Sequence, residues 1–73
     1  MKANKGLLEG LGKRCRMLRH RVGLSQLDMV RKCDFSLSHY QKIERGVLDP
    51  RFSTLKRLAK SFQVSVSELL DGL

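Results

Sequence analysis

The apolar residues in the first third of the chain recur at helical spacing. Between positions 6 and 22 they project onto one side of a helix: Leu7, Leu8, Leu11, Cys15, Leu18 and Val22. Such a stripe indicates an amphipathic helix whose apolar side faces a core. Gly23 follows as a typical helix-ending residue, so we predict a first helix over residues 6–22.

Two short helices that meet across a tight turn are predicted next. Ser25 and Asp28 have the spacing of a capping box, which opens a second helix over residues 25–33. After only two intervening residues, Asp34 and Phe35, Ser36 is a candidate N-cap for a third helix over residues 37–47. Helices joined this closely have the spacing of a helix-turn-helix.

The third predicted helix has two chemically different sides. Tyr40, Ile43 and Val47 fall on the inner side, and His39 flanks it, where we expect it to pack or to donate to a phosphate. The outer side is polar, basic and able to form hydrogen bonds, and it consists of Leu37, Ser38, Gln41, Lys42 and Arg45. Gly46 ends this helix, and a loop through Pro50 follows.

The rest of the chain predicts two more helices. The fourth has an apolar arc formed by Phe52, Leu55, Leu58, Ala59 and Phe62. Its other side contains Lys56, Arg57 and Lys60, which we interpret as a solvated face. Ser65 and Glu68 repeat the capping-box spacing and open a short last helix. Because the pattern contains no alternating strand, the predicted fold class is all-α with five helices. We assign Phe35 and Phe52 to the core together with Tyr40 and Ile43.

Length and charge limit the possible functions. The 73 residues suffice for one domain, predicted over residues 6–73 after a flexible N-terminal arm at 1–5. The chain has 15 Lys and Arg against 7 Asp and Glu, a net charge of +8, which indicates a partner with dense negative charge such as nucleic acid. No apolar tract approaches the roughly 20 residues that span a bilayer, and the start does not resemble a signal peptide. We therefore expect a cytoplasmic protein without a membrane partner.

The sequence offers little for catalysis or metal binding. Cys15 and Cys33 fall on predicted buried faces, where free cysteines behave as small apolar residues. Their spacing relative to His20 and His39 does not match a zinc site. No nucleophile and base pair or carboxylate pair is apparent, so we expect neither an enzyme nor a cofactor or small-molecule ligand.

Three blocks of sequence, following one another along the chain, contain recognisable motifs. They are LRHRVGLSQ at 18–26, FSLSHYQKIERG at 35–46, and the segment from Pro50 to Leu70. Together the blocks resemble the phage-repressor and Cro-like helix-turn-helix family, which includes xenobiotic-response-type regulators. The resemblance implies a compact five-helix, lambda-repressor-like domain whose second and third helices form the helix-turn-helix. It also implies a repressor or operon controller that binds double-stranded DNA at a pseudo-palindromic operator.

Two positions depart from the usual pattern of that family. Asp34 stands in the turn where Gly is common, but Asp tolerates the left-handed conformation, so we expect the turn to form. Val30 stands where a small Ala is usual at the contact between the second and third helices. The added methyl groups are expected to shift that contact slightly.

The resemblance assigns roles to individual side chains. We expect base edges to be read in the major groove by Leu37, Ser38, Gln41 and Lys42. Contacts to the DNA backbone are expected from Gln26, Ser36, Arg45 and Arg51. The resemblance also implies that Arg19 pairs with Glu44 in a partly buried ion pair that holds the third helix.

Assembly and function each leave an alternative open. We expect a homodimer, because one domain reads only about half a turn of DNA, and we place its interface at Leu69, Leu70 and Leu73. These leucines could instead simply close a small core. The alternative function is an antitoxin or adaptor that uses the same fold mainly to bind another protein.

Overall fold

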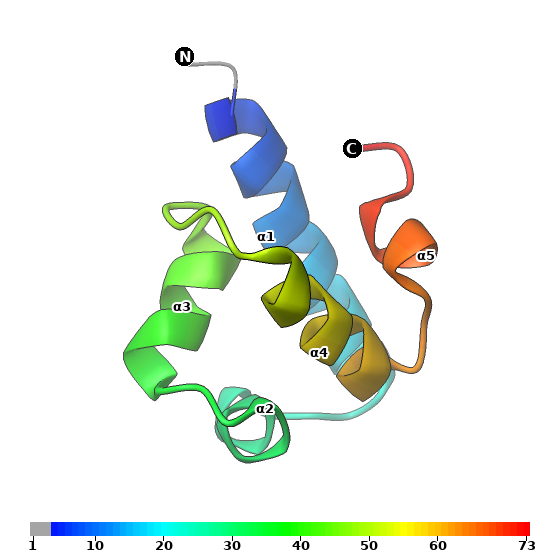
Figure 1. The fold of residues 1–73 in the computed structure, drawn as a ribbon. Helices are drawn as coiled ribbons and strands as arrows, with labels where there is room; N and C mark the ends of the chain where they lie inside the picture. The colour runs from blue at the N-terminus through cyan, green and yellow to red at the C-terminus, as the bar shows by residue number, and fades with distance from the viewer. Residues whose placement is uncertain (1–3) are drawn as a thin grey trace.

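The computed structural model describes residues 4–73, and this part of the chain contains five helices and no strand. They are α1 (Asn4–Arg21), α2 (Gln26–Cys33), α3 (Leu37–Arg45), α4 (Phe52–Phe62) and α5 (Val66–Leu70). Figure 1 shows the long α1 crossing behind α4, with α3 and α5 on opposite sides of that pair and α2 at its end. The predicted all-α class with five helices is confirmed.

The first helix starts earlier than predicted. It begins at Asn4, so residues 4 and 5, predicted as the end of a flexible arm, are helical. No proline opposes this extension of the helix. The remainder of the predicted arm, residues 1–3, lies outside the described residues. At its other end α1 stops at Arg21, and the chain turns at Gly23 with a φ of 74°.

Short polar side chains fix the two helices that flank the tight turn. Ser25 and Asp28 form the predicted capping box, with hydrogen bonds of 3.0 and 2.8 Å between side chains and backbone amides. The hydroxyl of Ser36 accepts a bond from the amide of His39 at 3.0 Å, which caps α3. Asp34 adopts the left-handed conformation with a φ of 57°, as predicted for this turn.

The apolar faces of all five helices meet in a single core. Its buried members are Leu11, Cys15, Leu18, Met29, Cys33, Phe35, Tyr40, Ile43, Leu58, Ala59, Phe62 and Leu69. Both cysteines are free and buried, as predicted. Burial raises the pKa of the Cys15 thiol to about 12, so this thiol stays protonated and packs as an apolar group.

Phe52, assigned to the core, and Val47, placed on the inner side of the third helix, are both exposed. Phe52 is 65% exposed, because α4 begins at this residue and the core is covered by the later turns of the helix. Val47 is 63% exposed. Gly46 has a φ of 73° and ends α3, so the helical projection does not apply to Val47. The core assignment of Phe52 and the inner-side placement of Val47 are wrong for the same reason, because each residue lies at or beyond a helix end.

Helices α1 and α3 approach each other closely at two glycines. A Cβ atom at Gly12 would lie 2.3 Å from the carbonyl oxygen of Glu44, and one at Gly46 would lie 2.7 Å from the Cα of Glu9. Any larger residue at either position would push the helices apart. The two glycines therefore set the position of α3 against α1.

Candidate nucleic-acid interface

Helix α3 presents its predicted outer side to solvent. Within the described chain, Ser38, Gln41 and Lys42 are exposed, and Leu37 is 37% exposed. On the opposite side of the same helix, Tyr40, Ile43 and Glu44 are buried. We call the four exposed residues (Leu37, Ser38, Gln41 and Lys42) the reading face.

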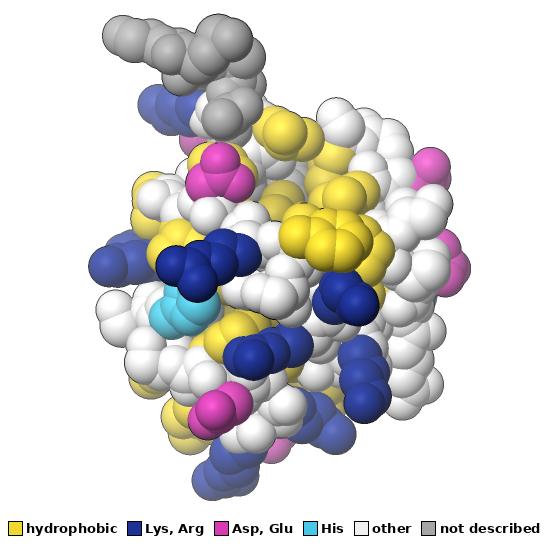
Figure 2. Space-filling model, in the orientation of Figure 1, with side chains coloured by type: hydrophobic (Ala, Val, Ile, Leu, Met, Phe, Trp, Pro, Cys, Tyr) yellow, Lys and Arg dark blue, Asp and Glu magenta, His cyan; other side chains and the backbone are white. Residues whose placement is uncertain are grey.

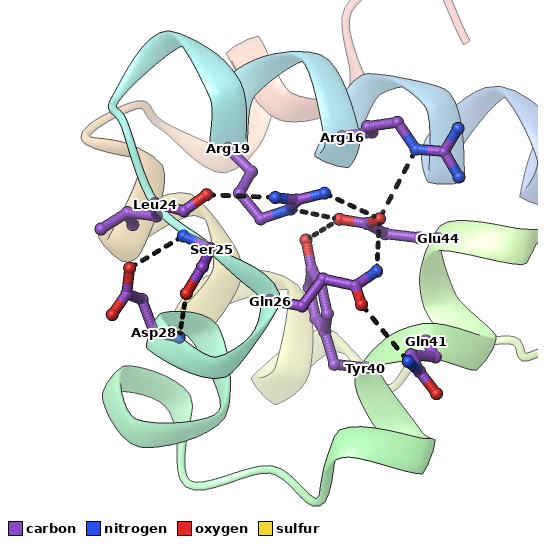
Figure 3. A network of polar contacts seen from close by, with 9 residues as sticks. All are labelled: Arg16, Arg19, Leu24, Ser25, Gln26, Asp28, Tyr40, Gln41 and Glu44. Carbon is purple, nitrogen blue, oxygen red and sulfur yellow. Dashed lines mark hydrogen bonds and ion pairs between the residues drawn. The ribbon is translucent and has the colours of Figure 1, made fainter.

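Glu44, on the buried side of α3, accepts hydrogen bonds from α1, α2 and its own helix (Figure 3). Arg19 donates twice, from Nε to Oε2 at 2.7 Å and from Nη2 to Oε1 at 3.3 Å. The Tyr40 hydroxyl also donates to Oε2. Arg19 is 8% exposed and Glu44 is 5% exposed. The ion pair implied by the resemblance is therefore present as a buried, two-pronged contact.

The electrostatics of this site favour a charged pair. Burial raises the pKa of Glu44, but hydrogen bonds from Arg19, Tyr40 and Gln26 outweigh it and hold this pKa below its ordinary value. The hydrogen bond to Glu44 raises the pKa of Arg19. Burial, followed by the hydrogen bond to Glu44, raises the pKa of Tyr40, so its phenol stays a neutral donor. Every buried side-chain nitrogen and oxygen among the described residues has a hydrogen-bond partner.

Gln26 connects this buried site to the reading face. Its Nε2 donates to Glu44 Oε1 at 3.0 Å, and its Oε1 accepts from Gln41 Nε2 at 3.3 Å (Figure 3). Within residues 4–73, the bond to Gln26 is the one side-chain hydrogen bond of Gln41, so its carbonyl oxygen and second N–H are available. An amide with one donor and one acceptor available can form a bidentate pair with adenine. We call Arg19, Gln26, Tyr40 and Glu44 the Glu44 network.

The residues predicted to contact the DNA backbone differ in exposure and in the bonds that they form. Gln26 is half-buried at the first position of α2, whereas Arg45 and Arg51 are exposed. Arg51 is the N-cap residue of α4 but makes no side-chain capping bond. The hydroxyl of Ser36, in contrast, is used as the N-cap acceptor of α3.

Two arginines have structural contacts that the sequence pattern does not reveal. Arg57, interpreted as a solvated residue, donates to the carbonyl oxygen of Cys33 at 3.3 Å and so satisfies the end of α2. Arg14 donates to three carbonyl oxygens around the end of α5, those of Glu68, Leu69 and Asp71. Carbonyl groups at helix C-termini lack intrahelical partners and attract cations. Neither contact could be predicted, because each joins segments far apart in sequence.

The leucines predicted for a dimer interface lie in different environments. Leu69 is fully buried in the core of its own chain, so its assignment to an interface is wrong. The capping box at Ser65 and Glu68 forms as predicted, and the short α5 that it opens contributes Leu69 as its buried residue. Leu70 is half-buried against the core, and Leu73 is 40% exposed.

Neither a metal site nor a membrane-spanning element is found in the described chain. Between residues 4 and 73, no three His, Cys, Asp or Glu side chains come together in a way that could hold a metal ion. Within the same range, every helix is too short or too polar to cross a membrane.

Sequence comparison relates the chain to known regulators. Residues 11–71 match the family described as a helix-turn-helix domain. Over 63 residues the chain is 33% identical to the HTH-type transcriptional regulator DdrOP3 of Deinococcus deserti. The match covers 86% of this chain and 49% of that protein, so the chain spans about half the length of this relative.

Two solved structures have a similar fold. The restriction-modification controller protein C.AhdI from Aeromonas hydrophila is 28% identical with a TM-score of 0.80, covering 88% of this chain and 96% of its own. The clp gene regulator ClgR from Corynebacterium glutamicum is 23% identical with a TM-score of 0.84, covering 88% of this chain and 68% of its own. At that identity the likeness to ClgR concerns the fold alone.

Proposed function

The chain belongs to the helix-turn-helix domain family, and on this premise we propose that it is a transcription regulator that places α3 in the major groove of double-stranded DNA. One observation carries the proposal: α3 exposes a polar reading face while its other side is fixed by the buried Glu44 network. A helix held rigidly on one side can present its other side to base edges in a defined register. We assign DNA binding and no catalysis to this domain, and we place it in the cytoplasm.

Each member of the reading face suits a particular base contact. Gln41 can pair with adenine, and Lys42 can donate to the acceptors of guanine. Ser38 can bond to either type of edge, and Leu37 can touch a thymine methyl group. The hydrogen bond from Gln41 to Gln26 favours one orientation of the reading amide before DNA arrives. Preorganisation of this kind lowers the entropic cost of binding.

Four further residues are proposed to hold the DNA backbone. They are Gln26, Ser36, Arg45 and Arg51. Gln26 lies at the N-terminus of α2, where free backbone amides favour a phosphate. The exposed guanidinium groups of Arg45 and Arg51 can each bind a phosphate with two N–H groups.

We further propose that the domain acts as a homodimer on a pseudo-palindromic site. Phe52 and Leu73 are large, exposed apolar residues, and Leu70 is half-buried. Figure 2 shows hydrophobic side chains gathered over the region where α4 begins. An apolar patch of this kind is typical of an interaction surface. Sedimentation velocity should detect a dimer at micromolar concentration, and a monomer at high micromolar concentration would contradict this assembly.

Selection of binding sites from random duplex DNA tests the function directly. We expect enrichment of one pseudo-palindromic site, bound about a thousandfold or more tightly than random duplex. Affinity should also fall steeply with salt as counterions are released. Weak binding that is equal for all sequences would contradict the proposal and favour the alternative of an adaptor or antitoxin.

A further inference from the structure

A groove of about 300 Å³ lies between α1 and α3, beside the Glu44 network. It is lined by Glu9, Lys13, Arg16, Glu44 and Arg45. We propose that this groove binds a phosphate group of the DNA backbone, so that Lys13 and Arg16 of α1 act with Arg45 as a clamp on that backbone. The inference rests on the proposed function, because its ligand is the duplex that α3 reads.

The charge in the groove favours an anion. Three cations line it against two carboxylates, and the carboxylate of Glu44 already accepts bonds from Arg19 on its buried side. The Glu44 side chain is 1% exposed, so little of its charge reaches the groove. Among residues 4–73, neither Lys13 nor Arg45 forms an ion pair. The groove therefore has a net excess of positive charge, although Glu9 also lines it and Arg16 contacts Glu44.

Arg16 joins the groove to the Glu44 network. Its Nε lies 3.6 Å from Glu44 Oε1, the same oxygen that accepts the bond from Gln26 (Figure 3). The Arg16 side chain is nevertheless 58% exposed. Because its contact with Glu44 uses Nε, the two terminal nitrogens remain available for a phosphate. A guanidinium can hold a phosphate with two parallel N–H bonds, which makes Arg16 the centre of the proposed clamp.

The position of α1 suits a strand that borders the major groove. Lys13 and Arg16 are three residues apart and share one face of the helix. Packed helices lie about 8–10 Å apart, and the major groove is about 12 Å wide. With α3 inside the groove, a helix packed beside it lies over the bordering sugar-phosphate strand. We expect the exposed cations of α1 to reach the phosphates of that strand.

The salt dependence of DNA binding tests the clamp. On the selected site, Lys13→Gln/Arg16→Gln should lower the slope of log affinity against log salt by about 0.9 for each phosphate that the variant no longer neutralises. The fold-loss in affinity should be equal on the selected site and on random duplex, because phosphates contain no sequence information. The matched control is Lys56→Gln/Lys60→Gln, which removes the same charge from the exposed side of α4.

The possible outcomes distinguish a failure of the clamp from a failure of the proposed function. A slope reduced no more than in the α4 control would overturn the clamp but would not affect the proposed role of the reading face. A wild-type protein that selects no site and binds no duplex would overturn the proposed function and the clamp together. The double variant also removes the contact of Arg16 with Glu44, so Lys13→Gln is measured alone as well. Lys13→Arg keeps the positive charge and should therefore keep the wild-type slope.

Discussion

The two sides of α3 differ in what holds them. The inner side, with Tyr40, Ile43 and Glu44, is buried and fully bonded within the chain. The outer side, with Ser38, Gln41 and Lys42, is exposed, and its one side-chain hydrogen bond among the described residues joins Gln41 to Gln26. Substitutions on the inner side should change stability, whereas those on the outer side should change binding and leave stability nearly constant.

The largest effect is expected at the inner side. Glu44→Ala removes the acceptor of Arg19, Gln26 and Tyr40 and leaves a buried guanidinium without its partner. Breaking a buried ion pair from one side costs about 3–5 kcal/mol. Urea denaturation should show this loss of unfolding free energy. An unchanged midpoint would show that the network does not stabilise the fold.

Acid should weaken the same network by a smaller amount. The pKa of Glu44 lies below its ordinary value, so its contribution to stability is present above about pH 4.3 and is lost as the pH falls through the lowered pKa. Asp28 and Glu68 have lowered pKa values too, because each accepts a bond from the backbone amide of a capping serine. Comparing wild type with Glu44→Gln isolates Glu44. The free energy of unfolding should fall less steeply in the variant below about pH 4.3, and parallel curves would contradict the assignment.

The contact between α1 and α3 should tolerate no added methyl group. Gly12→Ala places Cβ 2.3 Å from the backbone oxygen of Glu44, and we expect a loss of about 2–3 kcal/mol in spite of the better helix propensity of Ala. The control is Gly6→Ala in the same helix, where nothing lies within 4 Å. This change should stabilise the domain by about 0.5–1 kcal/mol. Equal effects of the two substitutions in thermal unfolding would refute the close approach.

Gly12 also illustrates what the sequence could and could not predict. Helices, caps and the tight turn follow from local spacing, which is why the five helices and the capping serines are predictable. From the sequence alone, a glycine inside a helix indicates only low helix propensity at that position. The close contact is not predictable, because the helix that the glycine meets lies far away in sequence. The link from Glu44 through Gln26 to Gln41 is likewise a tertiary contact.

Two of the wrong assignments share a physical cause. Phe52 and Val47 lie at or beyond helix ends, where angular projection no longer tells inside from outside. Apolar excess in the last helix suggests an interface role for Leu69, although the packing of α5 buries this residue in the core. Which apolar residues remain for a partner depends on packing across the whole domain, and local spacing contains no such information.

On the outer side, Gln41→Ala should affect binding and leave folding unchanged. Losing a bidentate base contact should cost about 1–3 kcal/mol on the selected site and relax the preference at one base position. Arg51→Ala should weaken binding more uniformly across sequences, because a phosphate contact does not discriminate bases. Affinities measured on single-base variants of the site separate the two classes. Equal losses on every sequence for Gln41→Ala would move this residue to the backbone class.

The smallest effect distinguishes two serines at the start of α3. Ser36 caps the helix through the bond from the amide of His39, so Ser36→Ala should cost about 1 kcal/mol of stability. Ser38 makes no side-chain bond within the described chain and faces solvent, so the same substitution there should stay within about 0.5 kcal/mol. For base specificity the order should be the opposite, with Ser38→Ala having the larger effect. The reason is that Ser38 is proposed to touch a base edge and Ser36 a phosphate. If Ser38→Ala destabilised the fold as much as Ser36→Ala, the division of α3 into a structural side and a reading side would not hold at its N-terminus.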